Sequence, residues 1–102
     1  QDRQIVSEEW VNAATKPDAP HLQPGVNKEF PLGYGYQWWI PETLEGEFSA
    51  IGVYNQFIYV NPTRDLVVVK LSAFSDYAVT LDESSYREIE TIEFFREVAN
   101  FL

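Results

Sequence analysis

Hydroxyl side chains are the first candidates for chemistry in this sequence, because a serine becomes a nucleophile when a base activates it. None of the serines begins a Ser-x-x-Lys motif, and none stands in Gly-x-Ser-x-Gly. They occur at Ser7, Ser49, Ser72, Ser75, Ser84 and Ser85. The single histidine, His21, lies in a proline-rich stretch, so the sequence places no base beside a hydroxyl. We therefore expect no self-contained Ser-His triad and no covalent step by this chain alone.

Paired acids are the second candidates, since two carboxyl groups can act as acid and base or nucleophile in glycoside hydrolysis. Such pairs occur at Glu8 and Glu9, at positions 82–83, and at Glu88 and Glu90. They fall at expected helix starts or on exposed faces, so solvation explains them better. The sequence has no cysteine and one histidine, which excludes thiolate and histidine-rich metal sites. We expect no metal and no other cofactor.

The charge of the chain limits its partners. Sixteen acidic against seven basic residues give a formal net charge of −9, which argues against nucleic acid and against an anionic membrane surface. No apolar run approaches the roughly 18 residues of a membrane-spanning helix. Aromatic residues make up 16% of the sequence, so either the core is dense or a surface awaits a partner. Because the chain begins with glutamine and contains no methionine, we infer that it is a piece of a longer protein.

The stretch from 47 to 74 predicts a long β-hairpin around which the rest is organised. Its arms, 56–60 and 66–73, are rich in the β-branched and aromatic residues that suit strands. Between them, Pro62 and the flanking Asn and Asp residues predict a turn. The apolar run 66–69 lacks polar alternation, which predicts a strand covered on both faces. A short strand, 48–51, precedes the hairpin, and the glycine after it indicates a bulge or a close approach to a ligand.

The remaining segments are predicted to pack on this sheet or to add a strand to it. Ser7 is typical of a helix N-cap, and Pro17 ends that helix. Residues 17–31 form a proline-rich excursion that either wraps the surface or packs on a partner. Residues 33–40 predict one strand, and a terminal amphipathic helix begins at Ser84 or Ser85. The strongly apolar face of strand 33–40 consists of Tyr34, Tyr36, Trp38 and Ile40.

These elements predict an α+β fold, an antiparallel sheet of three to four strands covered by N-terminal and C-terminal helices. An isolated piece of this kind should expose an apolar patch that includes Tyr36, Trp38 and Trp39. Either this patch or an open strand edge could support a homodimer.

Two runs in a fixed order resemble a known family. They are Gly-Tyr-Gly-Tyr-Gln-Trp-Trp at 33–39 and Ser-Ala-Ile-Gly-Val-Tyr-Asn-Gln-Phe-Ile-Tyr-Val-Asn-Pro-Thr-Arg-Asp-Leu-Val-Val-Val at 49–69. Together they resemble the C-terminal part of the serine β-lactamase superfamily, in its class C-like branch of 6-aminohexanoate-dimer hydrolase-like enzymes and related esterases. The resemblance implies that residues 1–102 are a single C-terminal α+β segment of a larger hydrolase, a fragment of the β-lactamase/transpeptidase-like fold.

The resemblance also implies which residues face a cleft. The third active-site motif of the family matches Ala50-Ile51-Gly52, and the backbone N–H of Val53 would then be an oxyanion-hole donor. The residues implied to bind substrate are Ala50, Ile51, Gly52, Tyr54, Asn55 and Gln56. The sequence departs from the family at Ala50, where β-lactamases carry Lys and many esterases carry His, and at Asn55, where Gly is expected. The missing cation favours a small, neutral amide or ester substrate.

Two functional hypotheses follow. In the first, the chain is the C-terminal portion of a serine hydrolase, inactive alone because the nucleophile lies on the remainder of the parent chain. In the second, it is a non-catalytic binding or assembly module with an aromatic docking face. The compartment is not fixed by the sequence, and the family resemblance allows a periplasmic or extracytoplasmic location.

Overall fold

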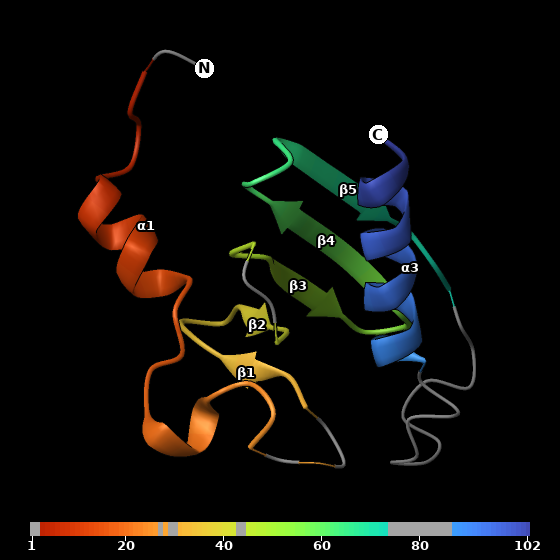
Figure 1. Ribbon diagram of the computed structural model, residues 1–102, viewed down its shortest axis with the longest axis horizontal. Helices are drawn as coiled ribbons and strands as arrows, with labels where there is room; N and C mark the ends of the chain where they lie inside the picture. Colours follow the sequence, from red (N-terminus) through yellow and green to blue (C-terminus); the bar gives the residue numbers. More distant parts are fainter. Residues whose placement is uncertain (1–2, 27, 29–30, 43–44, 74–86) are drawn as a thin grey trace. The chain divides into compact units, whose positions relative to one another are not determined.

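A computed structural model describes residues 3–26, 28, 31–42, 45–73 and 87–102 (Figure 1). They form two compact units, Gln1–Glu42 and Thr43–Leu102. The predicted single segment of a larger hydrolase stays a prediction. The helices in the described part of the chain are too short or too polar to span a bilayer.

The first unit, Gln1–Glu42, begins with helix α1, Glu8–Ala14. The Ser7 hydroxyl accepts a hydrogen bond from the Trp10 amide at 3.1 Å, so the predicted N-cap is confirmed. A short 3-10 helix, η1, follows at Pro20–Leu22 within the proline-rich excursion. Strands β1, Gly33–Tyr34, and β2, Trp39–Ile40, then pair antiparallel.

The prediction of one continuous strand over 33–40 is wrong, because a turn separates β1 from β2. The Gly35 amide donates to the Trp38 carbonyl at 2.9 Å, and Gln37 has a positive φ of 70°. A Cβ at Gly35 would lie 2.5 Å from the Ala14 carbonyl oxygen, so only glycine fits where this turn meets the end of α1. The apolar face expected for a single strand is therefore divided between two short strands and a turn.

The second unit, Thr43–Leu102, contains a three-stranded antiparallel meander and one helix (Figure 1). Its elements are β3, Phe48–Gly52; β4, Gln56–Asn61; β5, Leu66–Lys70; and α3, Glu88–Phe101. The predicted turn at 61–65 is present, and the Asn61 side-chain oxygen accepts from the Arg64 amide at 3.0 Å. The predicted α+β class with an antiparallel sheet is confirmed. The N-terminal helix belongs to the other unit, and positions 84–86, where the terminal helix was expected to begin, lie outside the described residues.

The core of this unit lies between the sheet and α3. Phe57 and Tyr59 of β4 meet Ile92 and Phe95 of α3, and all four are at most 2% exposed. The Phe95 ring lies edge-on to Phe57, with ring centroids 5.6 Å apart. The predicted apolar stripe is therefore confirmed at its centre, whereas Leu102 at its end is 86% exposed.

The prediction that both faces of the second hairpin arm are covered is wrong within residues 1–102, because one face of β5 is exposed. Val67 and Val69 are each 61% exposed, and Ile58, which pairs with Val69, is 43% exposed. The reason is that α3 packs on one face only, so alternate side chains of the apolar run point away from it. We call the face opposite α3 the outer sheet face. Its apolar residues are Phe48, Ala50, Ile58, Val60, Val67 and Val69.

Candidate functional site

The turn from Val53 to Asn55 joins β3 to β4 and carries the predicted oxyanion donor. Gly52 and Gln56 are the last cross-strand pair before it, and the Gln56 side-chain amide donates to the Val53 carbonyl at 3.2 Å. Tyr54 and Asn55 both have positive φ, 66° and 71°. The Val53 side chain is 57% exposed. Val53 and Tyr54 of this turn are therefore open to solvent.

The predicted site residues divide between the two sides of the sheet. Ala50 and Gly52 lie on the side of the outer sheet face, opposite Ile58 and Gln56. Ile51, in contrast, packs against the core under α3. The structure thus brings Gly52, Val53, Tyr54 and Gln56 together at the turn, with Ala50 further along the same strand, and turns the side chain of Ile51 inward.

Asn55 also points inward, and its backbone explains the departure from the family pattern. It is 4% exposed, and its side-chain oxygen accepts a hydrogen bond from the Lys70 ammonium. Its φ of 71° lies in the left-handed region, which glycine adopts freely and asparagine tolerates better than other residues. Asparagine can therefore stand at this position, where the resemblance led us to expect glycine.

Gly52 is not required by the local geometry. The ladder runs without interruption from Phe48 opposite Val60 to Gly52 opposite Gln56, so the interpretation of Gly52 as a bulge residue is wrong. A Cβ at Gly52 would lie 3.7 Å from its nearest neighbours, which is ordinary contact. The alternative reason for a glycine, close approach of a ligand to the strand, is compatible with this arrangement.

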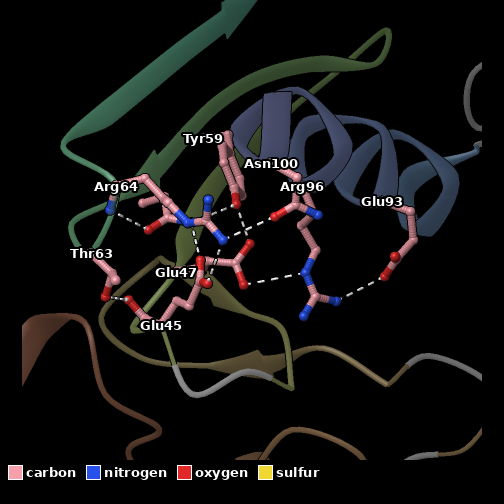
Figure 2. A network of polar contacts seen from close by, with 9 residues as sticks. Glu45, Glu47, Tyr59, Thr63, Arg64, Glu93, Arg96 and Asn100 are labelled. Atoms are coloured by element: carbon pink, nitrogen blue, oxygen red, sulfur yellow. Dashed lines mark hydrogen bonds and ion pairs between the residues drawn. The ribbon is translucent and has the colours of Figure 1, made fainter. Parts of the chain in front are cut away.

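A buried polar cluster that the sequence did not predict lies beneath the start of β3 (Figure 2). The Tyr59 hydroxyl donates to the carboxylate of Glu47, and the Arg96 guanidinium lies 3.3 Å from the other oxygen of that carboxylate. Tyr59 is 0% and Glu47 2% exposed. Burial, and then the hydrogen bond to Glu47, raise the pKa of the Tyr59 hydroxyl well above its ordinary value.

A second set of polar contacts ties the β4–β5 turn to the end of α3 (Figure 2). Arg64 contacts the Glu45 carboxylate at 3.1 Å and donates to the Asn100 side-chain oxygen at 3.0 Å. The Asn61 side-chain amide donates to the Glu45 carboxylate at 2.8 Å. The hydrogen bonds from Asn61 and Arg64 lower the pKa of Glu45. Because these groups satisfy one another, we interpret both sets as a brace that holds α3 on the sheet.

Two of the three acid pairs lie in the described part of the chain, both at helix starts. Glu8 and Glu9 occupy the first turn of α1 and are exposed, as expected. Glu88 and Glu90 occupy the first turn of α3, where Glu88 is buried rather than exposed. Positions 82–83 lie outside the described residues. Within the described ranges, no group of three or more His, Asp or Glu side chains could hold a metal ion.

Comparison with known proteins confirms the resemblance drawn from the sequence. No family model matches the chain. It is 33% identical over 75 residues to 6-aminohexanoate-dimer hydrolase from Paenarthrobacter ureafaciens, a match that covers 71% of this chain and 19% of that protein. The chain therefore spans about a fifth of the length of this curated relative.

A solved structure shares the fold. It is described as "Putative 6-aminohexanoate-dimer hydrolase from Bacillus anthracis" and matches with a TM-score of 0.62 at 21% sequence identity. The match covers 96% of this chain and 24% of the solved chain. The chain thus has the fold of one part of a larger protein and is similar in sequence to part of a hydrolase.

Proposed function

We propose that this chain is the C-terminal portion of a serine hydrolase of the β-lactamase superfamily. It contributes one wall of the active site and one oxyanion-hole N–H, that of Val53, to the hydrolysis of a small amide or ester. The nucleophile belongs to a Ser-x-x-Lys motif on the remainder of the parent chain. Residues 1–102 are therefore inactive alone.

One observation carries the proposal: the turn that matches the oxyanion segment is open, in a chain that is similar to a hydrolase. Val53 is 57% and Tyr54 51% exposed, so the side chains of these two turn residues reach solvent. Gly52 supports the same interpretation, because neither its backbone nor its neighbours demand glycine. A glycine at the end of β3 leaves room for a substrate carbonyl beside the strand.

The chemistry proposed for the turn is stabilisation of negative charge. When the serine oxygen attacks the carbonyl carbon, the carbonyl π electrons move onto oxygen, and the Val53 N–H donates to that oxyanion. The leaving amine or alcohol takes a proton as the acyl-enzyme forms, and water then hydrolyses the acyl group. Ala50 offers no cation, so the wall suits a substrate with a neutral group at that position.

The test substitution removes the backbone N–H of residue 53 and keeps a side chain of similar bulk. In the protein expressed from its whole reading frame, Val53→Pro deletes the N–H, and we expect kcat on a p-nitrophenyl ester to fall by about 10²–10³-fold. The matched control, Val53→Ala, keeps the N–H and should retain near wild-type kcat. If Val53→Pro folds, by circular dichroism, and hydrolyses the ester as fast as Val53→Ala, the proposed donor role is wrong.

The proposal that the nucleophile lies elsewhere has its own test. Residues 1–102 alone are incubated with a p-nitrophenyl ester and with nitrocefin, and we expect no turnover above background. Turnover that a serine-directed acylating probe abolishes would show that a nucleophile lies within these residues.

A second candidate function is a non-catalytic binding or assembly module. Trp10 and Tyr36 are 56% and 42% exposed, and their ring centroids lie 5.4 Å apart, so an aromatic pair stands at the surface of the first unit. Trp38 and Trp39 are half-buried, which makes the docking face smaller than the sequence predicted. If the whole protein shows no serine-dependent turnover, and Trp10→Ser reduces self-association in sedimentation, the module is favoured.

A further inference from the structure

Lys70, the last residue of β5, reaches the turn that carries Val53. Its ammonium donates to the Asn55 side-chain oxygen and lies 3.5 Å from the Thr91 hydroxyl of α3. It also lies 5.4 Å from the centroid of the Phe57 ring in β4. One side chain therefore contacts the β3–β4 turn, the centre of the sheet and the first turns of α3.

The turn needs such support because its backbone is unusual. Tyr54 and Asn55 follow one another in the left-handed region, which disfavours residues with a side chain. Backbone of this kind persists where surrounding contacts fix it, and such positions cluster at functional sites. Asn55 is 4% exposed, so its amide is held inside the unit while Val53 faces solvent. The hydrogen bond from Lys70 joins this residue to β5.

Thr91 extends the link into the helix. Its hydroxyl donates to the Arg87 carbonyl at 2.7 Å, which leaves an oxygen lone pair directed to the Lys70 ammonium. Since α3 is itself packed on Phe57 through Phe95, the ammonium is anchored to the buried core of the unit. A displacement of the turn would have to break this anchor.

We propose that Lys70 is a positioning residue for catalysis: by holding Asn55, it fixes the turn and thereby the direction of the Val53 N–H. This inference rests on the proposed function, in which that N–H binds the oxyanion. Lys70 itself touches neither the substrate nor the reacting atoms. Its ammonium is engaged on the α3 side of the sheet and does not replace the cation missing at Ala50.

The first test neutralises Lys70 in the whole protein. Lys70→Met keeps the aliphatic stem and removes the donor, and we expect kcat on a p-nitrophenyl ester to fall about tenfold while KM changes less than about twofold. The split arises because a misplaced donor weakens binding of the transition state more than binding of the substrate. Lys16→Met, the same change at an exposed lysine, should leave both constants unaltered. Lys70→Arg restores a charged donor and should recover part of kcat.

A second variant asks whether Lys70 acts through Asn55. Asn55→Gly keeps a residue that adopts positive φ and deletes the oxygen that accepts from Lys70. We expect it to lower kcat about as much as Lys70→Met, and the double variant to lower it no further. Because glycine suits this backbone, Asn55→Gly also keeps the test open if Lys70→Met fails to fold.

A third measurement reads the turn without catalysis. The backbone 15N order parameter of Val53 should fall from about 0.85 to below about 0.6 in Lys70→Met and stay high in Lys16→Met. Wild-type kcat in folded Lys70→Met and Asn55→Gly would overturn the inference, and so would an unchanged Val53 order parameter in Lys70→Met. If Val53→Pro also kept full kcat, the proposed function itself would fail. A loss of kcat in Val53→Pro alone would leave the proposed function standing without the role of Lys70.

Discussion

The hydroxyl of Tyr59 donates a hydrogen bond to the carboxylate of Glu47 inside the unit 43–102, where both side chains are almost completely buried. A buried carboxylate is costly unless it is paired and hydrogen-bonded. Here Tyr59 supplies the hydrogen bond and Arg96, from α3, supplies the charge (Figure 2). Glu47 directly precedes β3, so the brace fixes the strand that leads into the Val53 turn.

Tyr59→Phe should destabilise the protein by about 1.5–3 kcal/mol, because a buried carboxylate loses a hydrogen-bond donor. The ring and its contact with Phe95 remain. Urea denaturation followed by fluorescence measures the change. Tyr36→Phe, at a tyrosine that is 42% exposed, is the control and should stay within about 0.5 kcal/mol of wild type. Equal effects of the two variants would mean that the Glu47 contact contributes nothing to stability.

Arg96→Met should cost about 3 kcal/mol, because it leaves the Glu47 carboxylate buried without its cation. Adding Glu47→Gln removes the orphaned charge, so the double variant should be more stable than Arg96→Met alone. Thermal or urea unfolding of the two variants measures this coupling. Arg3→Met, at an exposed arginine, controls for the loss of positive charge. A double variant that is less stable than Arg96→Met would contradict the pairing of these two groups.

The Tyr59 contact also predicts a loss of stability at alkaline pH. The pKa of the Tyr59 hydroxyl is raised in the folded state, so its contribution is fully present below the unfolded pKa of about 10 and is lost as pH rises towards the folded pKa. The free energy of unfolding of wild type minus that of Tyr59→Phe should therefore shrink by about 1.4 kcal/mol between pH 9 and pH 11. Urea titrations at the two pH values measure it, and the remaining tyrosines cancel in the difference. A constant difference would show that Tyr59 titrates normally.

Local residue chemistry was sufficient to predict most of the second unit. Pro62 with its neighbouring Asn and Asp marked the β4–β5 turn, and apolar residues at steps of three and four marked the terminal helix. The prediction of one continuous strand over 33–40 failed for a non-local reason. Its alternation is genuine, but the chain turns at Gly35, where a Cβ would clash with the Ala14 carbonyl at the end of α1 and where the Tyr36 amide donates to that carbonyl at 3.0 Å.

The sequence indicated which stretch would carry the candidate site, but it did not predict the side-chain contacts that hold this stretch in place. The local motif around Gly52 singled out residues 50–56, but it indicated a bulge or a ligand contact at Gly52 and did not predict the turn at 53–55. The contact between Lys70 and Asn55, and the Glu47 cluster, join residues far apart in the sequence. No sequence periodicity predicts such pairs, because the residues of each pair come together only when the chain folds.

The last prediction concerns whether the outer sheet face is covered in the whole protein. Val69 is 61% exposed in a face made of apolar side chains, although apolar runs of this kind are typical of strands buried on both sides. In the proposed hydrolase the remainder of the parent chain packs there. Val69→Thr keeps the branched shape and adds a hydroxyl, which should cost about 1–3 kcal/mol in the whole protein if the face is covered.

Val26→Thr is the matched control, because Val26 is 57% exposed and lies outside this face. Both substitutions preserve β-branching, so a difference between them reports burial of the hydroxyl rather than backbone preference. Thermal unfolding of the whole protein should place Val69→Thr several degrees below Val26→Thr. Equal melting temperatures would mean that the outer sheet face stays open to solvent, and the parent chain would then have to meet the Val53 turn from another direction.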